Sequence, residues 1–257
     1  MQLSPSIEML FPTEDLPSRL QHLKDLGYEG FEFTVWWEKK DIDELTEAAR
    51  RLDLTVVALC TKFISLVDPT QRDAYIEGLK RSIEVAKKMG CTRLISQTGA
   101  ELPDVPRVQQ VQSLVDGLKA CAPILEAAGV TLVVEPLNTL VNHKGYFLSR
   151  SPEAFEIIRQ VNSPNVRILY DVYHQQITEG NLIRNIQENI DLIGHFHIAD
   201  NPGRQEPGTG EINYKNVLKA IRETGYSDWV GLEYRPSESK GSKGSLEDIL
   251  ALVQSIT

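Results

Sequence analysis

The chain has 257 residues, of which 41% are hydrophobic, and it carries a formal net charge of −9. No stretch approaches the ~20 apolar residues needed to cross a bilayer, so we expect no membrane span. An acidic balance without a run of Lys and Arg argues against binding of nucleic acid. The N-terminal segment lacks the features of a signal peptide, and the three cysteines form no CxxC motif, which favours a reducing cytoplasmic location.

Short β-rich runs alternate with longer amphipathic stretches along the whole chain. The runs that we interpret as strands cover residues 6–11, 28–35, 54–60, 92–98, 130–136, 166–172, 192–199 and 229–234. Between them, stretches such as 16–27 and 82–90 place apolar residues three and four positions apart and end in Gly, which is typical of a helix terminus. The segment 237–245, rich in Ser, Gly and Lys, reads as a flexible loop before the last helix.

This alternation predicts right-handed strand–helix–strand crossovers and therefore a parallel sheet. Eight such units favour an α/β fold of the (β/α)₈ TIM-barrel type, as a single domain over residues 1–257. An open doubly wound sheet is the alternative. That fold would want a glycine-rich phosphate turn after its first strand, and the sequence MLFPTED is not one.

Four polar residues follow apolar runs in the second half of the chain, each at the expected end of a strand. They are Glu135 in LVVEPLN, Asp171 in ILYDVYH, His197 in GHFHIAD and Glu233 in VGLEYRP. Strand ends meet at one mouth of a parallel barrel, where three carboxylates would repel one another without a cation. Oxygen ligands with one imidazole suit Mg²⁺ or Mn²⁺, with Co²⁺ also possible, better than a structural zinc. Taken singly, each residue could equally be a satisfied polar group or a helix cap.

Side chains two positions apart on a strand share a face, so the layer beneath these four residues can be traced. Val133 is expected beneath Glu135, Leu169 beneath Asp171, and His195 beneath His197. We interpret His195 as a deeper polar residue that holds a neighbour in place.

Other polar residues near expected strand ends have less definite roles. Glu32, in GFEF, is a candidate for lining the substrate pocket, or for pairing with a cation inside the barrel. Lys62 follows the third strand and could supply positive charge for an acidic substrate, or could simply be solvated. The loop that contains His143 and Lys144 reads as a mobile lid beside the site.

The motifs EPLN, DVYHQQ, NPGRQEPGTGEINY and GLEYRP resemble those of the xylose-isomerase-like TIM-barrel superfamily of sugar isomerases and epimerases. The closer resemblance is to the hydroxypyruvate isomerases. It covers much of the second half of the chain, whereas the first half matches only in its strand–helix rhythm and in GYEGFEF. The resemblance also implies a homo-oligomer, either a dimer or a tetramer.

The resemblance assigns roles to individual residues. It implies that Glu135, Asp171, His197 and Glu233 bind one divalent metal ion, and that Glu135 and Glu233 form the acid/base pair. It further implies that His174 and Arg204 contact a small-molecule substrate. A capping role for His174 and a surface position for Arg204 are the alternatives.

The chemistry of these groups fits an isomerisation. A proton must leave the carbon beside a carbonyl, and one carboxylate can remove it while a second group returns it to the adjacent carbon. We expect Glu135 to be the base, Glu233 its partner, and Asp171 and His197 to be purely structural ligands. A metal would act as a Lewis acid, and Arg204 would bind a substrate carboxylate.

Two activities remain open. One is isomerisation of a short hydroxy-keto acid, with hydroxypyruvate and tartronate semialdehyde as the pair. The other is a ketose 3-epimerase of the D-tagatose or D-psicose type, because those epimerases carry His where some hydroxypyruvate isomerases carry Gln in place of His197. DNA cleavage by a three-zinc cluster would need more histidines than the five present. A sugar-acid dehydratase and a non-catalytic sugar-binding barrel are further alternatives.

Overall fold

The computed structural model describes residues 1–37 and 42–256, and its strands form one parallel eight-stranded sheet. The strands are β1 (Gln2–Pro5), β2 (Gly30–Glu32), β3 (Thr55–Cys60), β4 (Arg93–Ser96), β5 (Thr131–Val134), β6 (Val166–Asp171), β7 (Ile193–Ile198) and β8 (Trp229–Leu232). Their order is β1-β8-β7-β6-β5-β4-β3-β2. A parallel bridge between Ser6 and Glu32 brings β1 beside β2, so the barrel is nearly closed. The expected TIM barrel is thereby confirmed.

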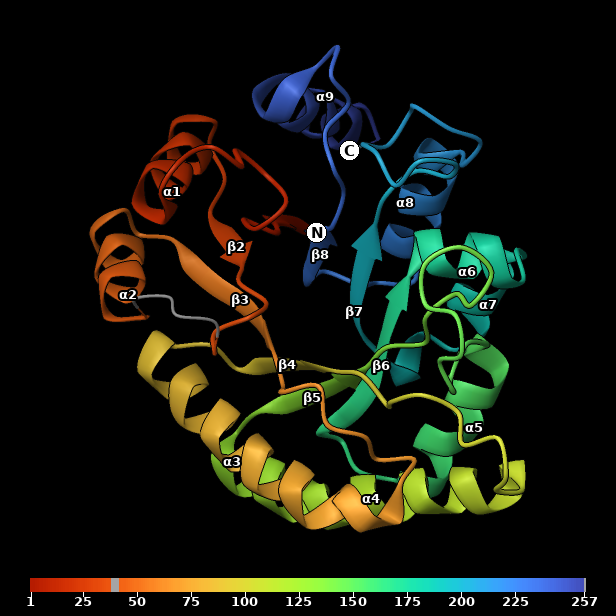
Figure 1. Cartoon of the computed structure of the whole chain (residues 1–257). Helices are drawn as coiled ribbons and strands as arrows, with labels where there is room; N and C mark the ends of the chain where they lie inside the picture. Colours follow the sequence, from red (N-terminus) through yellow and green to blue (C-terminus); the bar gives the residue numbers. More distant parts are fainter. Residues whose placement is uncertain (38–41, 257) are drawn as a thin grey trace.

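The helices lie outside the ring of strands, as Figure 1 shows. They are α1 (Leu16–Asp25), α2 (Ile42–Arg51), α3 (Arg72–Met89), α4 (Arg107–Ala128), α5 (Ser151–Val161), α6 (Val172–Thr178), α7 (Leu182–Glu188), α8 (Tyr214–Glu223) and α9 (Gly241–Ser255), with short 3₁₀ turns at Pro69–Gln71 and Ile190–Leu192. Gly90 and Gly129 end α3 and α4 in the left-handed conformation, with φ of 72° and 66°. Glycine adopts this conformation without steric cost, as the helix–Gly–strand pattern predicts.

Two expected boundaries are wrong, one at each end of the chain. The first strand is at 2–5 rather than 6–11, because the chain turns after Ser6 and buries Ile7 and Leu10 in that turn. Apolar residues buried in a turn give the same pattern as a short strand. The last helix begins at Gly241, inside the expected loop 237–245. There the Ser242 hydroxyl accepts a hydrogen bond from the Phe11 amide, so tertiary contacts override weak helix propensity.

The interior of the barrel is filled by side chains and is not a pore. An inner apolar cluster consists of Ala58, Cys60, Ile95, Val133 and Leu169. The register between β6 and β7 pairs Leu169 with His195 and Asp171 with His197. The two-layer arrangement expected from residue spacing is therefore present, with the polar residues of the second layer nearer the mouth.

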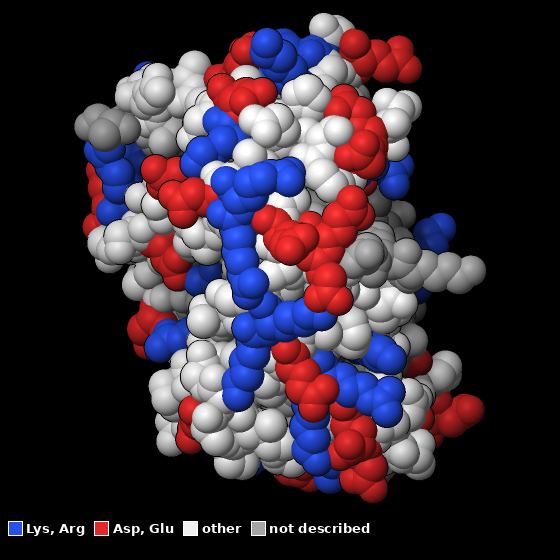
Figure 2. Space-filling view, turned by 90° about the vertical axis from the view of Figure 1, so that its left-hand side faces the viewer, with Lys and Arg blue, Asp and Glu red and all other residues white. Residues whose placement is uncertain are grey.

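The outer surface mixes charges of both signs. Figure 2 shows a band of Lys and Arg side chains on one face, with Asp and Glu side chains along both of its sides. Neighbouring helices are joined by such charges, for example where Lys88 of α3 pairs with Asp43 of α2. Among the described residues, no helix has both the length and the apolar character required to span a bilayer.

Candidate active site

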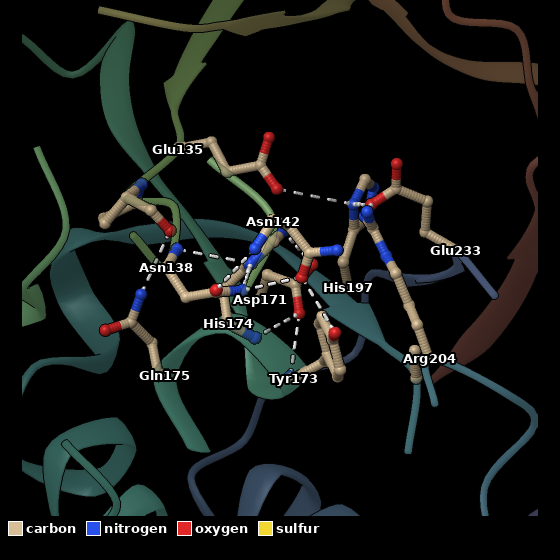
Figure 3. A network of polar contacts seen from close by, with 12 residues as sticks. Glu135, Asn138, Asn142, Asp171, Tyr173, His174, Gln175, His197, Arg204 and Glu233 are labelled. Atoms are coloured by element: carbon tan, nitrogen blue, oxygen red, sulfur yellow. Dashed lines mark hydrogen bonds and ion pairs between the residues drawn. The ribbon is translucent and has the colours of Figure 1, made fainter. Parts of the chain in front are cut away.

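The four strand-end residues converge at the mouth of the barrel. Glu135 follows β5, Asp171 ends β6, His197 lies near the end of β7, and Glu233 follows β8. Each offers one ligand atom, and these atoms all lie within 4.8 Å of one another. Figure 3 shows Glu135 and Glu233 approaching from opposite sides of the His197 ring. The sequence pattern thus located a real cluster, although the roles of its members stay predictions.

Asp171 connects the cluster to the start of a helix. Its Oδ1 accepts hydrogen bonds from the backbone N–H groups of Tyr173 at 2.8 Å and His174 at 3.1 Å, and so caps α6. This cap fixes the carboxylate in one orientation. Its Oδ2 lies 3.6 Å from Nε2 of His174, on the side facing the cluster.

His197 stands between carboxylates at two depths. Its Nδ1 lies 3.1 Å from Oε2 of Glu233 and 4.0 Å from Oε1 of Glu135, whereas its Nε2 lies 2.8 Å from Oε2 of Glu32. Burial acts to lower the pKa of His197, but the charges of Glu32 and Glu233 outweigh it and raise that pKa well above its usual range. In the chain alone, His197 therefore carries positive charge that balances its carboxylate neighbours.

Glu135 is buried and incompletely satisfied. Its side chain is 7% exposed, and its buried Oε1 has no hydrogen-bond partner in the part of the chain that the structure describes. Burial, reinforced by the negative charge of Glu233, raises the pKa of the Glu135 carboxyl well above its usual range. Oε1 of Glu135 lies within the cluster that contains two other carboxylates and an imidazole. A cation bound there would supply the missing partner and favour the ionised form of Glu135. The donor set Glu135, Asp171, His197 and Glu233 fits a divalent cation of the Mg²⁺ or Mn²⁺ kind.

Arg204 reaches the same cluster from the loop after β7. Its Nη2 donates to Oε2 of Glu233 at 2.6 Å, and its Cζ lies 5.5 Å from the centre of the Tyr173 ring. Burial acts to raise the pKa of Glu233, but the charges of Arg204 and His197 outweigh it and hold that pKa well below its usual range. The Nε of Arg204 is buried and has no hydrogen-bond partner among the described residues, so this guanidinium retains an unused donor beside the site.

The loop that presents Arg204 is folded around one carboxylate, Asp200. The Asp200 side chain accepts from the backbone N–H groups of Asn201, Gly208 and Ile212 at 2.7 to 3.1 Å. Its backbone C=O also accepts from the Arg204 N–H at 3.0 Å. Arg204 therefore belongs to an organised loop beside the site and is not a free surface arginine.

His174 is fully buried, and its two ring nitrogens are used differently. Nδ1 accepts from the Asn138 backbone N–H at 3.3 Å, with the Asn138 side-chain amide 2.5 Å away. Nε2 is buried and has no hydrogen-bond partner within residues 1–37 and 42–256. Burial lowers the pKa of His174 to about 4, so the ring is neutral near pH 7 and carries its proton on Nε2. A free donor thus points into the site, which a purely capping histidine would not provide.

The remaining candidates lie at different depths. Glu32 is fully buried beneath His197 and is not at the mouth, so its position offers no support for direct contact with substrate. Lys62 follows β3 and places its Nζ 5.7 Å from the centre of the Trp36 ring, at the rim of the barrel. The loop after β5 flanks the site, with the His143 ring 5.2 Å from the His174 ring. Whether this loop moves as a lid stays a prediction.

Several residues of the site were not singled out from the sequence. Asn138 holds both His174 and the following loop, because its Oδ1 accepts from the backbone N–H groups of Val141 and Asn142. The Tyr173 hydroxyl donates to Oδ1 of Asn142 at 2.8 Å. The position of Asn138 in EPLN was the available signal, since an amide just after a strand end is a common means of fixing a loop.

Comparisons with known proteins agree with this geometry. The model of the Xylose isomerase-like TIM barrel family matches residues 20–254. The hydroxypyruvate isomerase of Escherichia coli strain K12 is 32% identical over 245 residues, covering 92% of this chain and 94% of that protein. The 2-oxo-tetronate isomerase of Pectobacterium atrosepticum is 31% identical over 256 residues, covering 96% and 94%.

A solved structure extends the likeness to the whole fold. The crystal structure of AP endonuclease, family 2, from Brucella melitensis superposes with a TM-score of 0.90 at 25% identity, covering 97% of this chain and 98% of that one. The resemblance inferred from the motifs is therefore confirmed at the level of fold and family.

Proposed function

Because this chain belongs to the Xylose isomerase-like TIM barrel family and is an enzyme of the isomerase type, we propose that it isomerises a short hydroxy-keto acid. Hydroxypyruvate and tartronate semialdehyde are the proposed pair. Relatives that match nearly the whole chain are named for hydroxypyruvate and for 2-oxo-tetronate, both short keto acids. The single observation on which the proposal depends is the pair Glu135 and Glu233, facing each other across His197.

The two glutamates have opposite proton affinities, which suits an acid/base pair. Burial and the charge of Glu233 raise the pKa of Glu135, so this carboxyl favours its protonated form in the chain alone. The charge of a divalent ion in the proposed site would favour the ionised form, which would then be a strong base. Oε2 of Glu233 is held by Arg204 and His197 and is kept ionised. Glu135 would remove the proton from C3 of hydroxypyruvate, while the ionised Glu233 would take the hydroxyl proton of C3. Glu233 would then deliver its proton to C2 and Glu135 would deliver its proton to the oxygen of C2, so that both carboxylates end ionised. In the reverse direction the two glutamates exchange roles.

Glu135, Asp171, His197 and Glu233 would hold the divalent ion, with Mg²⁺ or Mn²⁺ as the proposed metal. When bound, such an ion supplies Lewis-acid polarisation of the substrate's carbonyl and hydroxyl oxygens. The chain's own residues keep the reaction dry, since three of these four side chains are less than 10% exposed.

A substrate carboxylate would find its partners on the Arg204 side of the site. The guanidinium of Arg204 pairs with carboxylates in two-pronged fashion, and its Nε is unused. The Nε2–H of His174 would donate to a substrate oxygen, since it has no acceptor of its own. Lys62 would add positive charge at the rim.

A panel of substrates tests the proposal. Metal-stripped enzyme is assayed with hydroxypyruvate, 2-oxo-tetronate, fructose and tagatose, before and after Mg²⁺ or Mn²⁺ is restored. We expect turnover of the keto acids, and only with metal present. Turnover of the ketoses alone, or equal rates with and without metal, would contradict it.

The second candidate, a ketose 3-epimerase, is favoured by one observation. His197 supplies an imidazole to the cluster, and both glutamates flank it, as an enzyme that works on two faces of one carbon requires. A neutral ketose has no use for Arg204 as a counter-ion. Fructose or tagatose turnover that exceeds keto-acid turnover would select this candidate.

A further inference from the structure

A second polar cluster lies beneath the candidate metal site and shares His197 with it. It consists of Glu32 from β2, His195 and His197 from β7, and Ser4 from β1, and we call it the lower cluster. Glu32, His195 and Ser4 are 0% exposed and His197 is 1% exposed. Ionisable side chains in the dry interior of a barrel are costly unless they are paired and hydrogen-bonded.

The hydrogen bonds of the lower cluster converge on Glu32. Its Oε1 lies 2.8 Å from Nε2 of His195 and accepts from the Ser4 hydroxyl at 2.7 Å. Its Oε2 lies 2.8 Å from Nε2 of His197. An ionised carboxylate only accepts hydrogen bonds, so both ring nitrogens that face it carry protons. Each oxygen of Glu32 thus accepts a hydrogen bond from within the lower cluster.

The contact between Glu32 and His197 requires that residue 231 is a glycine, which has no side chain. In the barrel register, Gly231 of β8 pairs with Ser4 on one side and with His197 on the other. A Cβ at position 231 would lie 2.4 Å from both Oε1 of Glu32 and Cδ2 of His197. Gly231 therefore leaves the gap through which Glu32, from β2, reaches a histidine on β7.

The consequence for His197 follows from the chemistry of imidazole. A neutral ring has one protonated nitrogen and one lone pair, and the acceptor placed at the first nitrogen determines which one is free. When the charged ring gives up one proton, Nε2–H stays donated to Glu32, so the lone pair is on Nδ1, the nitrogen that faces Glu233 and Glu135. A ligand nitrogen must be unprotonated, so this tautomer is the one that a metal site needs.

We propose that Glu32 is a positioning residue that fixes the ring orientation and tautomer of His197, with Ser4 and His195 fixing Glu32 in turn. The proposal rests on the metal site of the proposed function. It replaces the expectation that Glu32 contacts substrate with an action through His197.

The substitution Glu32→Gln gives a sharp test because it keeps shape and inverts one hydrogen bond. Ser4 and His195 both donate to Oε1, so the Gln oxygen would occupy that position and its NH₂ group would face Nε2 of His197. Nε2 would then have to accept, which moves the ring proton to Nδ1. We expect Mn²⁺ affinity, measured by calorimetry without substrate, to fall about 10- to 100-fold.

Glu179→Gln is the matched control. Glu179 is also a largely buried carboxylate. Its Oε1 accepts from the neutral donors Ser151 and Asn185, its Oε2 lies 4.0 Å from Nε of the exposed Arg150, and none of these partners is a histidine. Its Mn²⁺ affinity should stay within about twofold of the wild-type value, a range that is small beside the expected loss. Gly231→Ala perturbs the same Glu32–His197 contact from the opposite side and should also weaken Mn²⁺ binding.

Nitrogen-15 spectra of the histidine side chains in the Mg²⁺ form read the tautomer directly, without any variant. The proposal expects a one-bond N–H correlation for His197 at Nε2 and none at Nδ1. A proton on Nδ1 overturns it, even where neither variant folds. If Glu32→Gln and Gly231→Ala bind Mn²⁺ as the wild type does while His197→Asn does not, the positioning role fails and the metal site stands. A wild-type protein that binds no Mn²⁺ would contradict both the metal site and the positioning role of Glu32.

Discussion

The lower cluster and the mouth of the barrel contain the same kinds of side chains, but they differ in how many of their buried polar atoms have hydrogen-bond partners. Below, both oxygens of Glu32 accept hydrogen bonds from protein groups, and only Nδ1 of His195 lacks a partner. At the mouth, one buried polar atom each of Glu135, His174 and Arg204 has no hydrogen-bond partner among the described residues. Buried groups left unpaired are costly, so they are retained where a ligand completes them. The comparison teaches that the lower cluster positions residues and the mouth binds ligands.

The largest effect should come from the mouth. We expect Glu233→Gln to lower kcat for the keto-acid substrate by about 10³-fold or more, because it removes one of the two proton-transfer groups. The fold should persist, since Gln keeps the shape and the side chain is 17% exposed. Steady-state rates and circular dichroism check both statements.

Glu223→Gln in α8 is the control for that substitution, because its exposed carboxylate lies on the helix surface, where it pairs with Lys219. It should retain the wild-type rate. A Glu233→Gln enzyme with a near-normal kcat would take Glu233 out of the mechanism and leave the mouth as a binding site only.

A smaller effect should follow from Arg204→Gln. Loss of a charged hydrogen-bonding partner costs about 1.5–3 kcal/mol, which corresponds to roughly a 10- to 150-fold rise in KM for hydroxypyruvate. For a neutral ketose the same substitution should leave KM nearly unchanged. Parallel KM measurements on the two substrate classes check this, and an equal rise for both would show that Arg204 does not recognise the carboxylate.

The sequence was sufficient for the mouth and insufficient for the lower cluster. Glu135, Asp171, His197 and Glu233 could be brought together because a parallel barrel places all strand ends at one mouth. The pairing of Glu32 with His197 could not, since it crosses the barrel between β2 and β7 and depends on the missing side chain of Gly231. That gap appears only once the register of three strands is known.

The boundaries at the chain ends were missed for a related reason. Nothing local in 237–245 favours a helix. α9 begins there because the Ser242 hydroxyl accepts from the distant Phe11 amide, and the Ser245 hydroxyl accepts from Tyr234, which follows β8. Local pattern predicts elements well where propensity and packing agree, and it fails where packing decides alone.

Acid should destabilise the protein through His195 of the lower cluster. Burial lowers the pKa of His195 to about 4, below the usual value near 6.5, so the folded state keeps this ring neutral while the unfolded chain takes up a proton. As the pH falls from 6.5 to 5, that difference lowers the free energy of unfolding by up to about 1.4 kcal/mol per pH unit. Urea unfolding at several pH values gives the free energy of unfolding of wild type and of His195→Gln. The difference between the two should change with pH by this slope. Parallel profiles would mean that His195 takes up its proton over the same pH range in the folded and unfolded states.

The smallest effects should come from two hydroxyl deletions, one in each region. Ser4→Ala removes one of the two donors to Oε1 of Glu32, in the dry interior, so we expect it to lower the free energy of unfolding by about 1 kcal/mol. KM and Mn²⁺ affinity should change less than about threefold, because the hydrogen bond from His197 to Oε2 is untouched.

Tyr173→Phe should give the reverse pattern. It removes the hydroxyl that holds Asn142, which is exposed and can bond to water instead, so stability should change by less than about 0.5 kcal/mol. The ring stays beneath Arg204, but the loop that flanks His174 loses a contact, and KM should rise about two- to fivefold, the effect of one weak hydrogen bond. Urea unfolding and steady-state kinetics on both variants supply the four numbers. If Ser4→Ala altered KM and Tyr173→Phe altered stability, the division between a positioning cluster and a binding mouth would be wrong, because each hydroxyl would then be acting in the other region's role.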